Sequence, residues 1–305
     1  MANTTITPGI IRALRTQFNG SFQSAFSDAP VYHDRLATVV PSSTRSNTYG
    51  WMAKIPKIRE WIGERVVHRL AGRGFEIVNK DFELTVGVDR NDIEDENLGI
   101  YTPLMQQMGA EAKKHPDDLV FALITGGASA ECFDGQFFFD TDHPVDLDDA
   151  SKGVQSNALT LALNADNLMA ARKAMMDFKG ENGRPLGVRP TLLLVPTALE
   201  KTARDILAAS ALANGADNTI KGIVEYLVIP ELGAAFGGSD TAWYLLDTSK
   251  PIKPFIFQTR QPHQFVQKTS VSDESVFWTK EYIWGTNARY NAGYGLWFLA
   301  IRGNA

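Results

Sequence analysis

The stretch FEIVNKDFELTVGVDR, residues 75 to 90, restricts the fold more than any other part of the chain. Apolar and polar side chains alternate along it, which is typical of a strand with one buried face. The alternation changes phase at residues 79 to 81, which predicts a turn or bulge there. Together with the aromatic, basic and glycine-containing residues 49 to 74, it predicts a long extended hairpin. A two-stranded ribbon is marginal alone in water, so this hairpin needs further surfaces to pack against.

Charge separates sharply along the predicted hairpin. Residues 54 to 73 contain six Lys or Arg and two Glu, a balance of +4, whereas residues 76 to 96 contain eight acids and two bases, a balance of −6. Two interpretations stay open: both segments are solvated faces, or the basic segment of one copy lies over the acidic surface of another. The second interpretation makes the following residues candidates for contacts between subunits: Trp51, Arg59, Trp61, Arg65, Arg69, Arg73, Glu94, Asp95 and Glu96.

Residues 8 to 27 carry apolar side chains at helical spacing and end before Asp28-Ala29-Pro30, which predicts an amphipathic N-terminal helix. Three phenylalanines, Phe18, Phe22 and Phe26, lie on its apolar face. Such a face is buried either against the body of the same chain or against a neighbouring subunit, and these residues alone favour neither.

The rest of the chain predicts helices mixed with strands. A long helix begins near Thr102-Pro103 and runs to residue 125, with a kink or restart at Pro116. Residues 155 to 250 predict a separate α/β domain. Its elements are a helix at 164 to 178, a buried strand at 191 to 196, a capped helix through Ala209, and the strands EYLVIP and AWYLLD. Further on, PFIFQ predicts another strand, and residues 275 to 303 predict two aromatic strands around a turn at Gly285 to Gly295.

The segment FDGQFFFDTDHP, residues 133 to 144, holds the densest group of reactive side chains. Asp140, Asp142 and His143 are candidates for a metal-dependent hydrolase site, and Asp140, Asp142 and Asp146 are candidates for binding a hard cation through oxygens alone. The motifs HExxH, GxSxG, GxGxxG and GxxxxGK[ST] do not occur. We therefore expect no enzyme activity, no catalytic residues and no cofactor.

The alternative interpretation of this segment is a structural junction after the long helix. Asp134-Gly135 then forms a tight turn, and the step from Asp142 to Pro144 turns the chain toward the next domain. The three consecutive residues Phe137, Phe138 and Phe139 are expected to pack on a sheet.

Composition excludes several classes of protein. Cys132 is the single cysteine, which rules out internal disulfides and a Cys-based zinc cluster within one chain. A catalytic pairing of Cys132 with His143 would require a third, orienting group. The net charge of −5 argues against tight binding to nucleic acid. The apolar runs are far shorter than a spanning helix and the N-terminus lacks a secretory pattern, so we expect a cytoplasmic protein without a membrane segment.

Four blocks, taken together with the order of the predicted elements, carry a family likeness: FELTVGVDRNDIEDENLGIYTPL, FDGQFFFDTDHP, TLLLVPTALEKTARDIL and WYLLDTSKPIKPFIFQTR. The layout resembles the tailed-phage and herpesvirus major capsid fold, and more specifically the major head subunits of Mu-like phages, over nearly the whole chain. That resemblance implies an α+β fold with an N-terminal arm, an extended β-hairpin loop, a peripheral domain with a long spine helix, and an axial α/β domain.

The resemblance also implies which residues form each part. The arm takes residues 1 to 35 and the loop 45 to 88. The peripheral domain takes 36 to 44, 89 to 150 and 256 to 305, and the axial domain 151 to 255. In a shell, Trp51, Trp61 and the three phenylalanines at 18, 22 and 26 are then expected to be buried by other copies, and in a single copy to be exposed.

The function implied by the resemblance is a major capsid protein that self-assembles into the icosahedral head shell enclosing the phage genome. Implied partners are further copies in pentamers and hexamers, a scaffolding protein and a maturation protease during assembly, a portal protein, and in some shells a decoration protein. Packaged double-stranded DNA is expected to make weak, nonspecific contact with the acidic subunit, and a membrane none. The expected location is the virion, with assembly in the host cytoplasm. The alternative is an encapsulin-like shell that encloses protein cargo.

Overall fold

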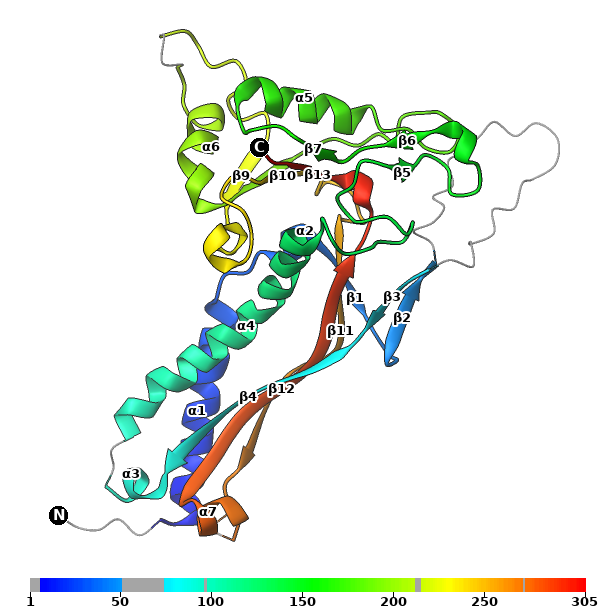
Figure 1. Ribbon diagram of the computed structural model, residues 1–305. Coiled ribbons are helices and arrows are strands. Elements are labelled where there is room, and N and C mark those ends of the chain that lie inside the picture. The colour runs from blue at the N-terminus through cyan, green and yellow to red at the C-terminus, as the bar shows by residue number, and fades with distance from the viewer. Residues whose placement is uncertain (1–5, 51–73, 96–97, 212–214, 271) are drawn as a thin grey trace.

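The computed structural model describes residues 6–50, 74–95, 98–211, 215–270 and 272–305. Figure 1 shows an elongated part, in which two long helices run beside a long sheet, and a compact α/β part at one end. The first described residues lie at the far end of the elongated part and the C-terminus lies in the compact part. None of the helices in these described ranges is both long enough and apolar enough to cross a membrane. The mixed helix and sheet fold predicted from the sequence is confirmed.

A four-stranded sheet forms the base of the elongated part. Its order is β1 (Ala37–Pro41), β11 (Phe255–Lys268), β12 (Glu281–Tyr294) and β4 (Lys80–Asp89). β1 is parallel to β11, and the other neighbours are antiparallel.

β12 is one continuous strand, so the predicted turn at Gly285 to Gly295 is wrong. Glycine has a different role in this strand. A Cβ built on Gly293 would lie 2.4 Å from Cδ1 of Ile77, which shows that the two chains approach too closely for a side chain. Gly293 therefore allows β12 and β3 (Phe75–Val78) to pack closely, and the chain does not change direction there.

Two long helices pack against this sheet. α1 (Pro8–Asp28) starts at the N-cap Thr7, whose Oγ1 accepts a hydrogen bond from the Ile10 amide (3.3 Å). α4 (Tyr101–Gly126) continues through Pro116 as a single helix. The helices and the sheet enclose one core, which consists of Ile11, Leu14, Phe18, Phe22, Val88, Ile93, Met105, Met108, Ala112, Val276, Tyr282 and Trp284.

The base of the predicted hairpin is present. β2 (Ser46–Tyr49) pairs antiparallel with β3 (Phe75–Val78). The break predicted at residues 79 to 81 falls at Asn79, whose buried Nδ2 donates to Ser42 Oγ (2.9 Å) and whose Oδ1 accepts from Gln258 Nε2 (2.8 Å). Beyond Asn79 the chain joins β12 as β4, so the paired ribbon stops at β3.

The compact part is a five-stranded sheet in the order β7 (Ala158–Leu159), β13 (Ala300–Gly303), β10 (Trp243–Leu246), β8 (Leu192–Val195) and β9 (Glu225–Val228). The helices α5 (Ala165–Met176) and α6 (Glu200–Leu207) contact its strands. These helices and the central strands were predicted from periodicity. The last strand, β13, comes from the region expected in the peripheral domain but pairs with β10.

Short elements complete the chain: α2 (His33–Leu36), α3 (Arg90–Glu94), α7 (Glu274–Trp278), β5 (His143–Pro144) and β6 (Val154–Gln155).

One hydrophobic cluster joins the two parts. The Phe138 ring stacks on Tyr294 of β12 at 4.6 Å between centroids, and the neighbouring Phe139 ring lies 5.4 Å from Tyr244 of β10. The segment at 133 to 144 therefore lies at the junction of the two sheets.

Candidate functional site

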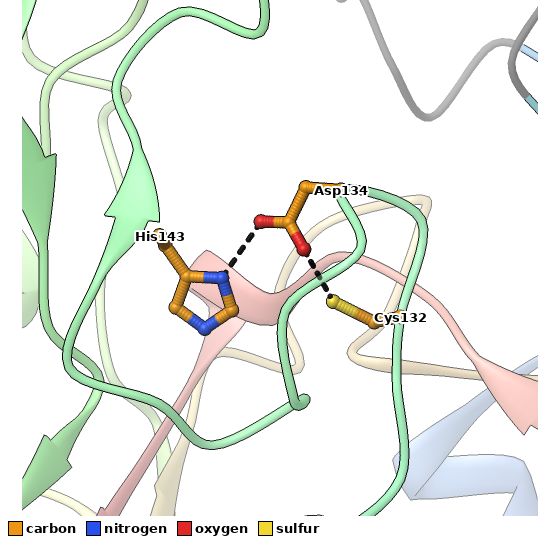
Figure 2. Close-up of side chains that lie close together, drawn as sticks. All are labelled: Cys132, Asp134 and His143. Carbon is orange, nitrogen blue, oxygen red and sulfur yellow. Dashed lines mark hydrogen bonds and ion pairs between the residues drawn. The ribbon is translucent and has the colours of Figure 1, made fainter. Parts of the chain in front are cut away.

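Cys132, Asp134 and His143 come together in a buried cluster at this junction. The two carboxylate oxygens of Asp134 face the other two residues: Oδ1 lies 3.0 Å from Cys132 Sγ, and Oδ2 lies 2.7 Å from His143 Nδ1. Figure 2 shows Asp134 between them, with one interaction to each side. The side chains of His143 and Asp134 are 0% and 1% exposed. Within the described residues, this is the group of His, Cys and acidic side chains whose ligand atoms converge.

A tight turn positions two members of the cluster. The Gly135 amide donates to the Cys132 carbonyl (3.1 Å) and the Cys132 amide donates to the Gln136 carbonyl (2.8 Å), which closes the turn. Gly135 has φ of +84°, a conformation that glycine adopts without strain. Asp134 Oδ1 also accepts from the Gln136 amide (3.1 Å). The turn predicted at Asp134-Gly135 is confirmed, and it points the carboxylate inward.

His143 is held in place from two sides. Its ring stacks on Trp297, with centroids 4.0 Å apart and planes at 6°. Its Nε2 lies 3.2 Å from Oδ1 of Asn157. The Asn157 amide is fully buried and is itself bonded to the backbone of two segments, residues 138 to 140 and 297 to 300. The imidazole therefore has one orientation and one set of neighbours.

The arrangement does not suit nucleophilic catalysis. Burial raises the pKa of the Cys132 thiol far above its usual range, and the nearby Asp134 carboxylate raises it further, so the thiol stays protonated. In a nucleophile–base pair the imidazole contacts the nucleophile, but here the carboxylate lies between them. Asp134 could be the third, orienting group that a Cys132–His143 pairing needs. However, it lies between the thiol and the imidazole, where it separates the two groups that would have to be in contact.

Asp140 and Asp146, which were candidates for a metal or cation site, have hydrogen-bond and ion-pair partners within the chain. Asp140 Oδ1 accepts from the Thr141 amide (2.7 Å) and its Oδ2 from the Phe137 amide (3.2 Å). Asp146 pairs with Lys152 at 2.6 Å, and Asp142 is exposed. His143 faces Asp134 and not Asp140 or Asp142. The structure does not bring the candidate metal ligands Asp140, Asp142 and His143 together: His143 Nδ1 faces Asp134, whereas the carboxylates of Asp140 and Asp142 interact with each other.

The three consecutive phenylalanines at 137 to 139 differ in burial. Phe138 and Phe139 are buried in the junction core, as predicted, whereas Phe137 is exposed. Sequence reasoning missed the roles of Asp134 and Asn157. The available signal was weak: an Asp-Gly pair predicts a turn, but nothing in it predicts which way the carboxylate points.

The residues predicted to contact other subunits have different surroundings. Phe18 and Phe22 are fully buried against α4 and the long sheet of the same chain, and Phe26 is half-buried. The expectation that a single copy exposes these phenylalanines is wrong, because the helix that carries them docks on its own subunit. Glu94 forms an ion pair with Arg90 (2.8 Å), and Asp95 is exposed. Outside the described residues lie Trp51, Arg59, Trp61, Arg65, Arg69, Arg73 and Glu96.

A pair of exposed aromatic residues was not predicted. Phe277 is 75% exposed and Trp278 is 77% exposed, both on α7 at the far end of the long sheet. Both were assigned to a strand from their aromatic surroundings. Adjacent, solvent-exposed aromatic side chains are unusual on a surface that no partner covers.

The chain matches the family model described as Mu-like prophage major head subunit gpT over residues 11–162, 158–232 and 233–305. The chain belongs to this family. The assignment made from the four sequence blocks is confirmed, and as a Mu-like major head subunit the chain is a major capsid protein of a tailed phage.

Individual relatives agree with the family match. This Mu-like head subunit is 34% identical to the major capsid protein of Escherichia phage Mu over 296 residues, which is 97% of this chain and 74% of the relative. In the procapsid of bacteriophage JBD30, a subunit with 38% identity superposes with a TM-score of 0.64, covering 98% of this chain and 76% of that subunit. A subunit of the JBD30 capsid decorated with minor capsid protein trimers has 38% identity and a TM-score of 0.56, covering 73% of this chain and 98% of that subunit.

Proposed function

We propose that copies of this chain close into an icosahedral head shell of pentamers and hexamers that encloses a phage genome. The observation that carries the proposal is the likeness to the JBD30 procapsid subunit, which extends over 98% of this chain at 38% identity. The shell is assembled in the host cytoplasm and becomes part of the virion. Relatives that are phage capsid proteins favour this function over an encapsulin-like compartment.

In this proposal the parts of the subunit have separate roles. The extended loop at 45 to 88 reaches neighbouring copies, whereas the arm at residues 1 to 35 carries α1, whose apolar face packs on its own subunit. The peripheral domain takes 36 to 44, 89 to 150 and 256 to 305, except that β13 belongs to the compact sheet. The axial domain at 151 to 255 surrounds the centre of each pentamer or hexamer. The elongated and compact parts of the fold support this division, since a shell needs both a capsomer centre and an extended flank.

Contacts between subunits are proposed at the charged and aromatic surfaces. The basic segment at 54 to 73 and the acidic residues Glu94, Asp95 and Glu96 are opposite in charge, and complementary charges fix the register between subunits. The exposed pair Phe277 and Trp278 adds an apolar anchor at the same end of the long sheet as Glu94 and Asp95.

The subunit acts as a structural protein without enzyme activity. The buried thiol, the inward-facing carboxylate and the stacked imidazole at the junction support this, because no reactive group of the cluster faces a solvent-exposed surface. Packaged DNA touches the shell only weakly, in keeping with a net charge of −5. Further proposed partners are a scaffolding protein, a maturation protease, a portal protein and a decoration protein.

Electron microscopy of the purified full chain tests the proposal. Closed shells or tubes are expected, and particles purified from an infected or induced host are expected to contain DNA. Small, monodisperse oligomers under all assembly conditions would contradict shell formation, and shells filled with protein cargo would favour the encapsulin-like alternative.

A pair of variants tests the aromatic contact. Phe277→Ser combined with Trp278→Ser is expected to reduce shell yield several-fold, while the circular dichroism spectrum stays unchanged because both side chains are exposed. Val154→Ser changes another exposed apolar residue, which is 61% exposed, and serves as the control. Equal shell yields from the two variants would remove α7 from the proposed contacts.

A further inference from the structure

The hydrogen-bond partners of Asn157 determine the protonation of the neighbouring imidazole. The Asn157 Nδ2 lies 2.7 Å from the Phe138 carbonyl and 3.2 Å from the carbonyls of Trp297 and Ala300. Its Oδ1 accepts from the Asp140 amide at 2.8 Å. Three acceptors on one side and a donor on the other allow only one orientation of the amide.

That orientation places a hydrogen-bond acceptor against Nε2 of His143. Asn157 Oδ1 lies 3.2 Å from Nε2, so Nε2 must carry a proton. In the neutral imidazole the other nitrogen, Nδ1, then presents a lone pair. This lone pair points at a carboxylate oxygen, Asp134 Oδ2, at 2.7 Å. Two acceptors at this distance repel each other unless a positive charge lies between them.

The third member of the cluster supplies another exchangeable proton. Cys132 Sγ lies 3.0 Å from Asp134 Oδ1, and this contact requires the thiol proton. Two protons therefore occupy the space between a sulfur, a carboxylate and an imidazole nitrogen, and all three ligand atoms lie within 4.8 Å of one another. A single divalent cation can replace both protons without changing the net charge of the cluster.

We propose that Cys132, Asp134 and His143 form a three-ligand binding site for Zn²⁺. Sulfur, imidazole nitrogen and carboxylate oxygen are the three donors that zinc accepts in proteins. The thiolate favours zinc over magnesium or calcium, which prefer oxygen ligands alone. Asn157 supplies the outer hydrogen bond that fixes the tautomer of a metal-bound histidine, since it accepts from Nε2 and leaves Nδ1 free for the ion.

Zinc binding releases two protons and requires the Asp134 carboxylate to move from its place between the thiol and the imidazole. The thiol proton and the proton between Nδ1 and Oδ2 leave as the ion enters. With zinc about 2.3 Å from sulfur and about 2.0–2.1 Å from nitrogen and oxygen, tetrahedral geometry separates the S···O and N···O pairs by about 3.3–3.6 Å. At present the sulfur and the nitrogen contact different oxygens of Asp134, at 3.0 and 2.7 Å, so the carboxylate must turn to offer one oxygen to the ion while both contacts lengthen. Water or a backbone carbonyl completes the fourth position.

The site stabilises the junction of the two sheets when it is loaded. Cys132 and Asp134 follow α4, His143 lies on β5, and its Trp297 neighbour leads into β13. An ion bound to all three ligands cross-links the turn after α4 to β5, and His143 connects it to the segment before β13 through its stacking on Trp297. Because the ligands are buried, the ion is expected to enter while the chain folds, and exchange in the folded subunit to be slow.

Refolding in the presence of metal tests the site. The full chain is unfolded in denaturant with a chelator and a thiol reductant, then refolded with either Zn²⁺ or Co²⁺, and the bound metal is measured after gel filtration. We expect one equivalent of zinc per chain and an increase in the thermal unfolding midpoint. The Co²⁺ form is expected to show the intense near-ultraviolet absorption of a sulfur-to-cobalt charge transfer.

Two variants make the test specific. Cys132→Ser is expected to lose the charge-transfer absorption and to bind metal at least tenfold more weakly. Asp142→Asn changes an exposed carboxylate of the same segment and is expected to keep one equivalent of metal and the full absorption. Stoichiometry below 0.1 equivalents in the wild-type chain, or a cobalt spectrum that Cys132→Ser leaves unchanged, would show that protons alone fill the cluster.

Discussion

Phe18 of α1 meets Trp284 of β12 edge to face, with ring centroids 5.2 Å apart and ring planes at 81°. Both side chains are fully buried, although one comes from the first helix and the other from near the end of the chain. The contact makes the N-terminal helix part of the folded body of a single subunit. Any movement of this helix during assembly must therefore first break a packed core.

Truncating Phe18 is expected to destabilise the isolated subunit. Phe18→Ala removes a fully buried ring from the core between α1, α4 and the long sheet, and such changes typically cost about 3–5 kcal/mol. Phe277→Ala is the matched control, since it removes the same ring from a site that is 75% exposed and is expected to stay within about 0.5 kcal/mol of wild type. Urea unfolding of the unassembled chain measures both. Equal effects of the two substitutions would mean that α1 does not dock on its own subunit in solution.

The contact between the two long helices predicts opposite effects for two glycine substitutions. A Cβ on Gly109 of α4 would lie 2.3 Å from the Phe22 carbonyl oxygen in the backbone of α1, so Gly109→Ala must push the helices apart. Gly20→Ala, in the middle of α1, meets nothing within 4 Å and is expected to stabilise by up to about 1 kcal/mol, because alanine favours helix. Thermal unfolding midpoints should therefore move in opposite directions. A neutral Gly109→Ala variant would be inconsistent with this close approach.

Acid is expected to destabilise the subunit through a histidine pair between α4 and the sheet. The Tyr290 hydroxyl lies 2.9 Å from His115 Nδ1 and 3.2 Å from His263 Nε2, and the other His263 nitrogen lies 3.2 Å from Thr286 Oγ1. Burial first, and then the neighbouring histidine, lower the pKa of His263 to about 4, and burial lowers the pKa of His115 although Asp118 opposes the shift.

A lowered pKa in the folded state means that the unfolded chain binds the proton more readily. The stability that the neutral rings contribute is therefore complete above the unfolded pKa of about 6.5 and is lost as the pH falls toward 4. His263→Gln is expected to lose less unfolding free energy than wild type between pH 6.5 and pH 4, when both are measured by urea titration at each pH. Parallel curves for the two chains would contradict this assignment.

Asn157 is expected to be the most sensitive amide in the junction. Asn157→Ala removes the side-chain partner of the Asp140 amide and of the Phe138 carbonyl, and each unsatisfied buried group costs about 1–3 kcal/mol, so a loss of at least about 2 kcal/mol is expected. Asn182→Ala, in an exposed turn, is the control and should change stability by less than about 1 kcal/mol. Chemical denaturation compares them, and similar losses would show that the Asn157 bonds are replaced by water.

Several elements could be predicted because their signals are local. The apolar spacing of residues 8 to 27 and the run between Thr102 and Gly126 predicted helices that the structure contains almost to the residue. The alternation of apolar and polar residues breaks at Asn79, where the chain stops pairing with β2 and begins to pair with β12. The errors arose where a residue's role depends on a distant neighbour: the glycines between Gly285 and Gly295 predict a turn, but the strand passes straight through Gly285 and Gly293.

The sequence by itself determined the helices, most of the strands, the absence of the common catalytic motifs and the family, because periodicity and ordered blocks of residues are properties of short segments. The tertiary structure alone decided that Phe18 and Phe22 of the first helix are buried in their own subunit. It also decided that Asp134, not Asp140 or Asp142, faces His143. Both outcomes depend on which surfaces meet when distant segments pack, and the direction of a side chain at a turn or on a helix face does not reveal its partner.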